Sequence, residues 1–251
     1  MSKIALVTGS SRGLGRNTAL SIARQGGDVI VTYHSRADDA ERVVAEIEAL
    51  GRKAVALQLD TGTTAGFPDF VERLRAVLDS TWQRQSFDHL VNNAGHGDAA
   101  PFAETTEAQF DTLLNVHLKG VFFLTQALLP LLADGGRIVN LSSGLTRISH
   151  PGFSAYAAMK GAVEVLSVYM AKELGSRGIA VNCVAPGAIE TGVGGVVPGR
   201  GDPRGGGQGC RAAFRRLPVP ARRHVAYGPA CHQRRTLAGR APPSGTGGRR
   251  R

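Results

Sequence analysis

The chain has 251 residues and a formal net charge of +10, and nearly all of that charge lies at one end. Residues 1–191 hold 17 lysines and arginines against 19 acidic residues, a net charge of −2, whereas residues 192–251 hold 13 arginines against one aspartate, a net charge of +12. The larger segment therefore gives no electrostatic argument for binding nucleic acid. The three cysteines have neither the density of a disulfide framework nor the spacing of metal ligands, so we expect no metal site.

The first residues read as a strand rather than as a targeting segment. Residues 3–8 are apolar and β-favouring, without a charged region that leads into an apolar stretch and a cleavage site. The most apolar stretch, 121–132, is interrupted by Thr125, Gln126 and Pro130, and it falls short of the roughly 18 residues that span a membrane. We expect a soluble, cytoplasmic protein with no membrane partner.

Through residue 191, short apolar runs alternate with longer segments of helical periodicity. Strands are expected at 3–8, 28–33, 53–59, 88–92, 136–141 and 179–184, and helices at 13–25, 37–50, 67–84, 107–132 and 154–176. Strands that are apolar at nearly every position are buried on both faces, so the pattern predicts an α/β fold with a doubly wound parallel sheet of Rossmann type. Ligands of such sheets bind at the carboxyl ends of the strands.

A glycine-rich loop follows the first expected strand and opens the first helix. Its spacing is Gly-x-x-x-Gly-x-Gly, which differs from the common dinucleotide fingerprint. Glycines permit the tight turn and let the backbone approach a pyrophosphate at the positive end of the helix. The loop predicts cofactor binding by Gly9, Ser11, Arg12, Gly13, Leu14 and Gly15.

The end of the second strand, at residues 33–36, carries no acidic residue. A carboxylate there would accept hydrogen bonds from a ribose 2′-hydroxyl and repel a 2′-phosphate. Ser35 and Arg36, together with Arg12, are instead suited to hold a phosphate by charge-assisted hydrogen bonds. We therefore expect NADP(H) as the preferred cofactor, with NAD(H) as the alternative.

Three later strand ends complete the expected cofactor site. Asp60, after the third strand, is placed to accept a hydrogen bond from an adenine amino group. The fourth strand ends in small and amide residues that permit close approach of a cofactor and tie loops together. The last clear strand leads into a loop that crosses the nicotinamide end. The residues assigned to these two ends are Asn92, Ala94, Gly95, Pro186, Gly187 and Thr191.

Chemistry is expected from Ser143, Tyr156 and Lys160. Tyr156 and Lys160 are four residues apart in a helical segment, so their side chains share one helix face. A nearby ammonium lowers the pKa of a phenol and makes it a usable proton donor. Ser143 lies at the end of a buried strand, where its hydroxyl meets the phenol at a carbonyl oxygen.

Asn115 lies inside the expected helix 107–132, flanked by apolar residues. Asparagine is a weak helix former, so the residue is either an exposed polar position or the start of a kinked turn. A kinked turn would free its carbonyl to hold a water.

Together, these residues resemble the short-chain dehydrogenase/reductase superfamily in its simple one-domain form. The resemblance covers residues 1–191. It rests on the motifs Thr8-Gly9-x-x-x-Gly13-x-Gly15, Asn92-Asn93-Ala94-Gly95, Asn115, Ser143, Tyr156-x-x-x-Lys160, and Pro186-Gly187 with Thr191. Arg12 and the missing acid after the second strand resemble the NADPH-dependent ketoacyl-carrier reductases and their relatives.

The resemblance implies an oxidoreductase that transfers a hydride between NADP(H) and a small carbonyl or secondary alcohol substrate. Tyr156 would be the acid/base, and Ser143 would orient the carbonyl. Lys160 would bind the nicotinamide ribose, lower the pKa of Tyr156 and begin a proton relay through a water held by Asn115. Thr191 would contact the carboxamide of the cofactor.

Residues 192–251 depart from the family pattern. They contain 14 glycines, 7 prolines and 13 arginines, with no sustained period of a helix or strand. Such a segment buries too little apolar surface to offset its ordering entropy, so we expect a disordered tail and no seventh strand. Either the tail is an authentic basic extension that binds polyanions, or it arises from a coding frameshift near residue 192. We favour the frameshift, because the abrupt change to an Arg/Gly/Pro/Ala composition is typical of a GC-rich gene read out of frame, and because few aromatic residues interleave the arginines to stack on bases.

Two expectations follow for the assembled protein. Members of the superfamily associate through the helices corresponding to 107–132 and 154–176 and through the C-terminal region, so we expect a homo-oligomer, either a dimer or a tetramer. The alternative to an active enzyme is a catalytically impaired remnant that binds nucleotide or polyanions without turnover.

Overall fold

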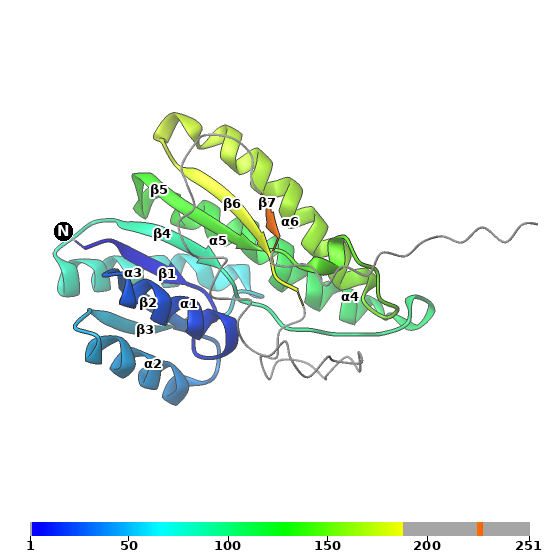
Figure 1. Ribbon diagram of the computed structural model, residues 1–251, viewed down its shortest axis with the longest axis horizontal. Helices are drawn as coiled ribbons and strands as arrows, with labels where there is room; N and C mark the ends of the chain where they lie inside the picture. Colours follow the sequence, from blue (N-terminus) through cyan, green and yellow to red (C-terminus); the bar gives the residue numbers. More distant parts are fainter. Residues whose placement is uncertain (1, 188–224, 228–251) are drawn as a thin grey trace, which may run out of the picture.

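The structure is a computed structural model and describes residues 2–187 and 225–227. Strands and helices alternate along this part of the chain (Figure 1). The strands are β1 (Ile4–Val7), β2 (Asp28–Tyr33), β3 (Ala54–Gln58), β4 (Phe87–Asn92), β5 (Leu132–Leu141), β6 (Ala180–Ala185) and β7 (Val225–Tyr227). The α-helices are α1 (Gly13–Arg24), α2 (Ala37–Ala49), α3 (Phe67–Trp82), α4 (Glu107–Leu114), α5 (Gly120–Leu128) and α6 (Ser154–Glu173).

The strands form one parallel sheet in the order β3-β2-β1-β4-β5-β6-β7, which runs from the bottom to the top of Figure 1. The crossover between β3 and β4 reverses the direction in which strands are added, as in a doubly wound fold. The predicted α/β Rossmann-type sheet is therefore confirmed for its six main strands.

The expected absence of a seventh strand is corrected by the structure. Val225, Ala226 and Tyr227 pair in parallel with Cys183, Val184 and Ala185 of β6. The reason is local, because the outer edge of β6 offers backbone groups that any short extended segment can pair with. Valine and tyrosine favour strands, and a three-residue run is too short to show periodicity. The expected disorder of 192–251 otherwise concerns residues outside those described.

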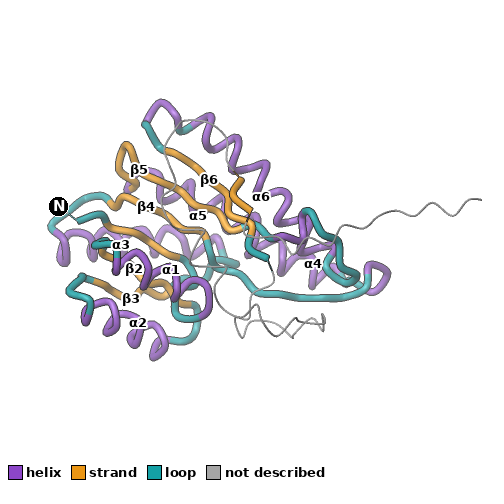
Figure 2. The backbone as a smooth tube through the Cα atoms, viewed as in Figure 1, coloured by secondary structure: helices purple, strands orange, loops and turns teal. Residues whose placement is uncertain are grey.

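Helices cover both faces of the sheet (Figure 2). On one face, α1 and α2 pack on apolar side chains of the central strands; this cluster includes Val7, Ala19, Val29, Val43 and Ile47. On the other face, α3 and α5 pack on a second cluster that includes Ile4, Phe70, Leu90, Leu124 and Ile138. Both faces of β1, β2 and β4 are therefore buried, which explains their nearly continuous apolar sequences.

The expected helix 107–132 is one helical stretch with an irregular middle. A π-helical turn, η3 (Asn115–Lys119), separates α4 from α5, and a 3₁₀ turn with Pro130 ends the stretch, so β5 begins at Leu132. By length and composition, Glu107–Leu131 would be sufficient to cross a membrane. In this fold Leu113, Leu124 and Leu128 are buried in the protein instead.

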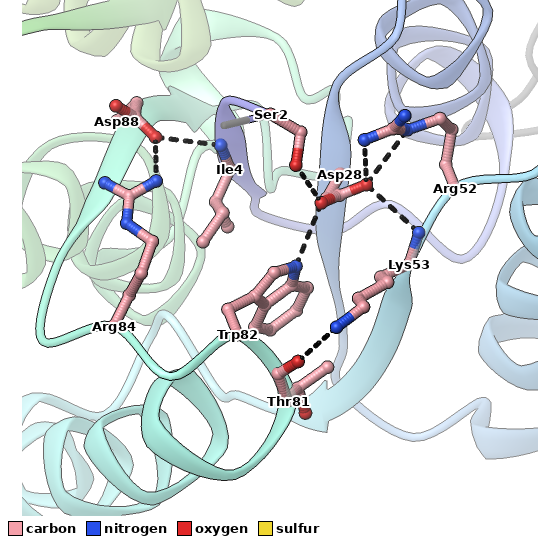
Figure 3. Close-up of polar contacts among 9 residues, drawn as sticks. All are labelled: Ser2, Ile4, Asp28, Arg52, Lys53, Thr81, Trp82, Arg84 and Asp88. Carbon is pink, nitrogen blue, oxygen red and sulfur yellow. Dashed lines mark hydrogen bonds and ion pairs between the residues drawn. The ribbon is translucent and has the colours of Figure 1, made fainter.

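Two buried carboxylates hold together the amino ends of the strands, opposite the ligand-binding end (Figure 3). Asp28 accepts hydrogen bonds from Ser2, Arg52, Trp82 and the backbone of Lys53. Asp88 accepts from Lys3, Arg84 and the backbone N–H of Ile4. Burial raises the pKa of Asp88, but these hydrogen bonds and the Arg84 charge outweigh it and lower the pKa to about 2.

Candidate active site

The glycine loop between β1 and α1 is built for close backbone contact. Gly9 adopts φ +62°, and a Cβ atom there would lie 2.9 Å from the Cα of Ala94. A Cβ at Gly15 would lie 2.3 Å from the carbonyl oxygen of Gly9. Any side chain at these two positions would therefore displace the loop, which explains the glycines.

Short polar side chains tie the loops after β1, β2 and β4 together. The Thr8 hydroxyl accepts the backbone N–H groups of Asn93 and Ala94, both at 2.9 Å. The Asn93 amide donates to the carbonyls of Thr8 and Gly9. Thr32, on β2, accepts from the backbone N–H of Gly9 at 3.1 Å. The expectation that the asparagines tie neighbouring loops together is confirmed for Asn93.

The N-terminus of α1 is free to meet an anion. Arg12 is its N-cap residue and makes no side-chain cap, and the first turn holds no acidic residue. The backbone N–H groups of this turn and the helix dipole therefore favour a negatively charged group. With Gly9, Gly13 and Gly15, this turn fits a dinucleotide pyrophosphate.

The end of β2 carries exposed basic residues. Ser35 and Arg36 are exposed, as is Arg12 in the neighbouring loop, and Arg36 also forms an ion pair with Asp39 at 3.3 Å. Asp60 folds back on its own loop and accepts from the backbone of Gly62 and the hydroxyl of Thr63. Burial raises the pKa of Asp60, but these hydrogen bonds outweigh it and lower the pKa.

Asn92, which the sequence places among the cofactor-binding residues, is buried beneath the site. Its amide donates to Asn140 at 2.8 Å and to Thr125 at 3.0 Å, and Asn140 donates to Ser167 on α6. The network links the ends of β4 and β5 to α5 and α6. Its buried polar groups are thus paired with one another, and the Asn92 side chain has structural partners.

Ser143, Tyr156 and Lys160 lie together, as the sequence predicts. Ser143 follows β5, and its hydroxyl is hydrogen-bonded to the phenol of Tyr156. Tyr156 and Lys160 lie one turn apart on α6, and the Lys160 Nζ is 5.7 Å from the centre of the Tyr156 ring. The Lys160 ammonium donates to the carbonyl of Leu141 at 2.8 Å. A phenol, a hydroxyl and a buried cation therefore lie close together at the carboxyl end of the sheet.

The pKa of Tyr156 differs from the sequence-based expectation. Burial raises this pKa, and the hydrogen bond to Ser143 offsets only part of the increase. Burial also lowers the pKa of Lys160 to about 8. The expected lowering of the phenol pKa is therefore wrong: desolvation raises it, because burial removes the side chain from water.

The loop that carries Ser143 is fastened to its surroundings. Glu164 on α6 accepts from the hydroxyls of Ser142 at 2.7 Å and Thr146 at 2.8 Å. The N–H of Gly144 donates to the carbonyl of Pro186 at 2.8 Å. Pro186 and Gly187 therefore lie beside Ser143, whereas Thr191 lies outside the described residues.

Asn115 begins the π turn, and its carbonyl accepts the N–H of Gly120, five residues on. The expected kinked turn is therefore present, but the carbonyl that it was expected to free is hydrogen-bonded to Gly120. The buried residue that the turn directs toward Tyr156, however, is His117, whose ring lies 5.1 Å from the Tyr156 ring. His117 is not among the site residues predicted from the sequence. The available signal was its place in the buried helical series Leu113, His117, Val121.

A cavity of about 330 Å³ opens beside these residues. It is lined mainly by apolar side chains from the loop after β5, the start of α6 and the segment before α4. They include Phe102, Leu145, His150, Phe153 and Ala157. Leu145 follows Ser143 by two residues and Ala157 follows Tyr156 directly, so the cavity is lined by sequence neighbours of both residues.

Residues 3–198 match the family model described as short chain dehydrogenase. The chain belongs to the short-chain dehydrogenase family. This finding confirms the resemblance stated above and extends the matched segment slightly beyond residue 191.

Relatives of this short-chain dehydrogenase include reductases from bacteria and plants. A 3-oxoacyl-(acyl-carrier-protein) reductase, FabG, of Staphylococcus epidermidis is 41% identical over 191 residues, covering 75% of this chain and 76% of the relative. An NADPH-dependent aldehyde reductase-like protein of Arabidopsis thaliana is 38% identical over 202 residues, covering 75% and 73%.

Solved structures of the family show the same fold. The angucycline C-6 ketoreductase LanV with bound NADP is 39% identical, with a TM-score of 0.73 over 76% of this chain and 74% of that chain. A short chain dehydrogenase from Burkholderia cenocepacia in complex with NADP is 42% identical, with a TM-score of 0.70 over 75% of each chain.

Proposed function

We propose that this short-chain dehydrogenase reduces a carbonyl group to a secondary alcohol with NADPH, with Tyr156 as the acid. The observation that carries the proposal is the cluster of Ser143, Tyr156 and Lys160 at the carboxyl end of the sheet, beside an apolar cavity. Relatives about 40% identical to this chain support it: a FabG reductase, a ketoreductase with bound NADP and a short chain dehydrogenase in complex with NADP.

The residues divide the chemistry between them. A reduced nicotinamide supplies the hydride when bound. Ser143 donates a hydrogen bond to the carbonyl oxygen and stabilises the negative charge that develops there. Tyr156 transfers its phenolic proton to that oxygen, and the Lys160 ammonium stabilises the resulting phenolate. In alcohol oxidation the same groups act in the opposite direction.

The glycine loop and the exposed arginines support NADP(H) as the cofactor. Backbone N–H groups at the start of α1 would hold the pyrophosphate. Arg12, Ser35 and Arg36 would hold the 2′-phosphate, because arginine pairs with phosphate through charge-assisted hydrogen bonds. Asp39 forms ion pairs with Arg36 and Arg42, so its carboxylate is already neutralised by two arginines.

The cavity supports a small, mostly apolar carbonyl substrate. Phe102, Leu145 and Phe153 would contact its hydrocarbon part. His150 is one of the polar lining residues, with Ser149 and Ser154, that would meet a substrate oxygen. The reacting carbonyl would enter between Ser143 and Tyr156.

Exposed apolar side chains support a homo-oligomer. Phe110, Phe122 and Phe123 lie on α4 and α5, and their exposed fractions are 41%, 42% and 42%. Val165 and Tyr169 on α6 are 59% and 62% exposed. Helix α6 packs beside α4 and the π turn that leads into α5. Large exposed apolar residues on such adjoining helices favour association. The assembly would be a dimer or a tetramer.

One observation favours the alternative, a chain that binds nucleotide without turnover. The family match ends at residue 198, and 13 arginines crowd the remaining segment. Fluorescence titration of the full chain with NADPH and NADH, followed by a ketone panel monitored by NADPH absorbance, separates the two functions. Saturable binding that favours NADPH, with ketone-dependent oxidation, supports the reductase. Nucleotide binding without turnover supports the alternative. Binding of neither nucleotide contradicts the reductase and leaves polyanion binding as what remains of the alternative.

A further inference from the structure

His117 is a buried histidine beside Tyr156, and it has no role in the proposed reaction. It lies in the π turn between α4 and α5 and is 1% exposed. Its ring meets the Tyr156 ring edge to face, at an interplanar angle of 81°. The inference that follows rests on the proposed function, because it concerns how the acid of that reaction is placed.

The position of the His117 ring is fixed from two sides. Its Nε2 lies 2.8 Å from the carbonyl oxygen of His96. On the other side, a Cβ atom at Gly95 would lie 2.6 Å from the ring Cε1. The ring therefore occupies space that only glycine at position 95 leaves open. It connects the loop after β4, which carries the cofactor-facing motif, to the acid on α6.

The tautomer of His117 follows from its partner. A carbonyl oxygen only accepts hydrogen bonds, so Nε2 carries the proton and Nδ1 holds a free lone pair. Nδ1 is buried and has no hydrogen-bond partner in the described part of the chain. Burial first, and then the positive charge of Lys160, lower the pKa of His117 to about 3. The ring is therefore neutral and acts by its shape and its hydrogen bond.

The buried lone pair indicates why histidine occurs here. Leaving a buried acceptor unpaired is unfavourable, and an apolar ring would fill the same space without that cost. An apolar ring, however, would leave the His96 carbonyl without its hydrogen bond, and the loop after β4 would lose its attachment to the π turn. Histidine meets both needs, because its ring fills the space beside Tyr156 and its N–H group anchors the loop after β4.

We propose that His117 is a positioning residue: anchored by the His96 carbonyl, its ring orients the Tyr156 phenol and shields it from water. The groups that face the phenol are Ser143 from the loop after β5, Lys160 from its own helix, and His117 from the π turn, with His96 behind it. Of these, His117 supplies the apolar ring surface.

The test uses the full chain with tyrosine labelled with ¹³C at the ζ carbon. NMR titration then gives the pKa of Tyr156 directly, and Tyr156→Phe assigns its signal. The variants are His117→Ala, which removes the ring, and His117→Phe, which restores a ring without the hydrogen bond. His89→Ala is the matched control, because His89 on β4 also has a buried Nδ1 without a partner but lies among Asp88, Lys3 and Arg137.

We expect His117→Ala to lower the pKa of Tyr156 toward its ordinary value as water reaches the phenol. It should reduce kcat for a ketone on the order of 100-fold while NADPH affinity stays near that of the parent. His117→Phe should return the pKa to the parent value and recover part of kcat. His89→Ala should change neither quantity.

An unchanged Tyr156 pKa in His117→Ala would overturn the proposal, as would equal effects of His89→Ala. The NMR titration needs no turnover. A parent chain that reduces no ketone would therefore count against the proposed function alone, and the placement of the phenol by His117 would still be tested.

Discussion

The ammonium of Lys160 donates to the carbonyl of Leu141 at 2.8 Å, rather than to the phenol of Tyr156. This bond fastens the middle of α6 to the end of β5, one residue before Ser142. It holds Tyr156 and Ser143 in fixed positions relative to each other, although they lie 13 residues apart in the sequence. It also fixes a cation that is only 5% exposed, and its pKa is about 8.

The depressed pKa of Lys160 predicts a pH limit on activity. Below about pH 8 the side chain is charged and stabilises the phenolate, and above it the proton is lost. We expect kcat for ketone reduction to fall as the pH rises through about 8. Lys160→Arg keeps its charge throughout this range and should lose that limb of the pH profile. A limb that persists in Lys160→Arg would assign it to another group.

Removing the phenolic hydroxyl should abolish proton transfer. We expect Tyr156→Phe to reduce kcat by about 10²- to 10⁴-fold, since it deletes the general acid while leaving the ring in place. NADPH affinity, measured by fluorescence titration, should stay close to that of the parent. Tyr169→Phe on the same helix, at a side chain 62% exposed, is the control and should retain full activity. Comparable losses in both variants would contradict the assignment.

The close contacts of the glycine loop predict unequal effects of two helical glycines. Gly15→Ala would place a Cβ 2.3 Å from the Gly9 carbonyl and displace the loop, so we expect NADPH affinity to fall by roughly tenfold or more. Gly161→Ala on α6 meets nothing within 4 Å and should leave affinity unchanged while adding stability. Equal affinities of the two variants would show that the loop does not bind the cofactor.

If the exposed arginines bind the 2′-phosphate, replacing them should weaken the binding of NADPH but not of NADH. We expect Arg12→Ala and Arg36→Ala each to weaken NADPH binding by roughly tenfold, through loss of charge-assisted hydrogen bonds, and to leave NADH binding nearly unchanged. Arg42→Ala is the control, because Arg42 shares Asp39 with Arg36 but lies a turn and a half further along α2. Parallel losses for NADPH and NADH would refute the 2′-phosphate role.

The buried Asp88 predicts acid sensitivity of the fold. Its pKa is lowered from 3.8 to about 2, so its contribution to stability is present above about pH 4 and is lost as the pH falls toward 2. That contribution is about 2 kcal/mol. Asp88→Asn should therefore lower the free energy of unfolding at neutral pH. The same variant should lose less of that free energy as the pH falls, and urea unfolding at a series of pH values measures both effects. Asp134→Asn, at a carboxylate 76% exposed, is the control. An identical decline in Asp88→Asn would contradict this account.

The sequence by itself determined the order of the elements and the doubly wound sheet. Near-continuous apolar runs separated by helical periods leave few other folds, and strand ends were located within a few residues. Motifs near in sequence were also recovered, because Tyr156 and Lys160 share a helix face through spacing alone. Ser143 was placed from its position at the end of a buried strand.

Tertiary structure decided what lies between elements distant in the chain. The contacts of His117 with Gly95 and Tyr156 join a strand end, a π turn and a helix, and no local pattern encodes them. The same holds for the seventh strand, whose three residues pair only because the edge of β6 is open. The pKa of Tyr156 followed burial rather than its neighbour in sequence, because desolvation depends on everything packed around a side chain.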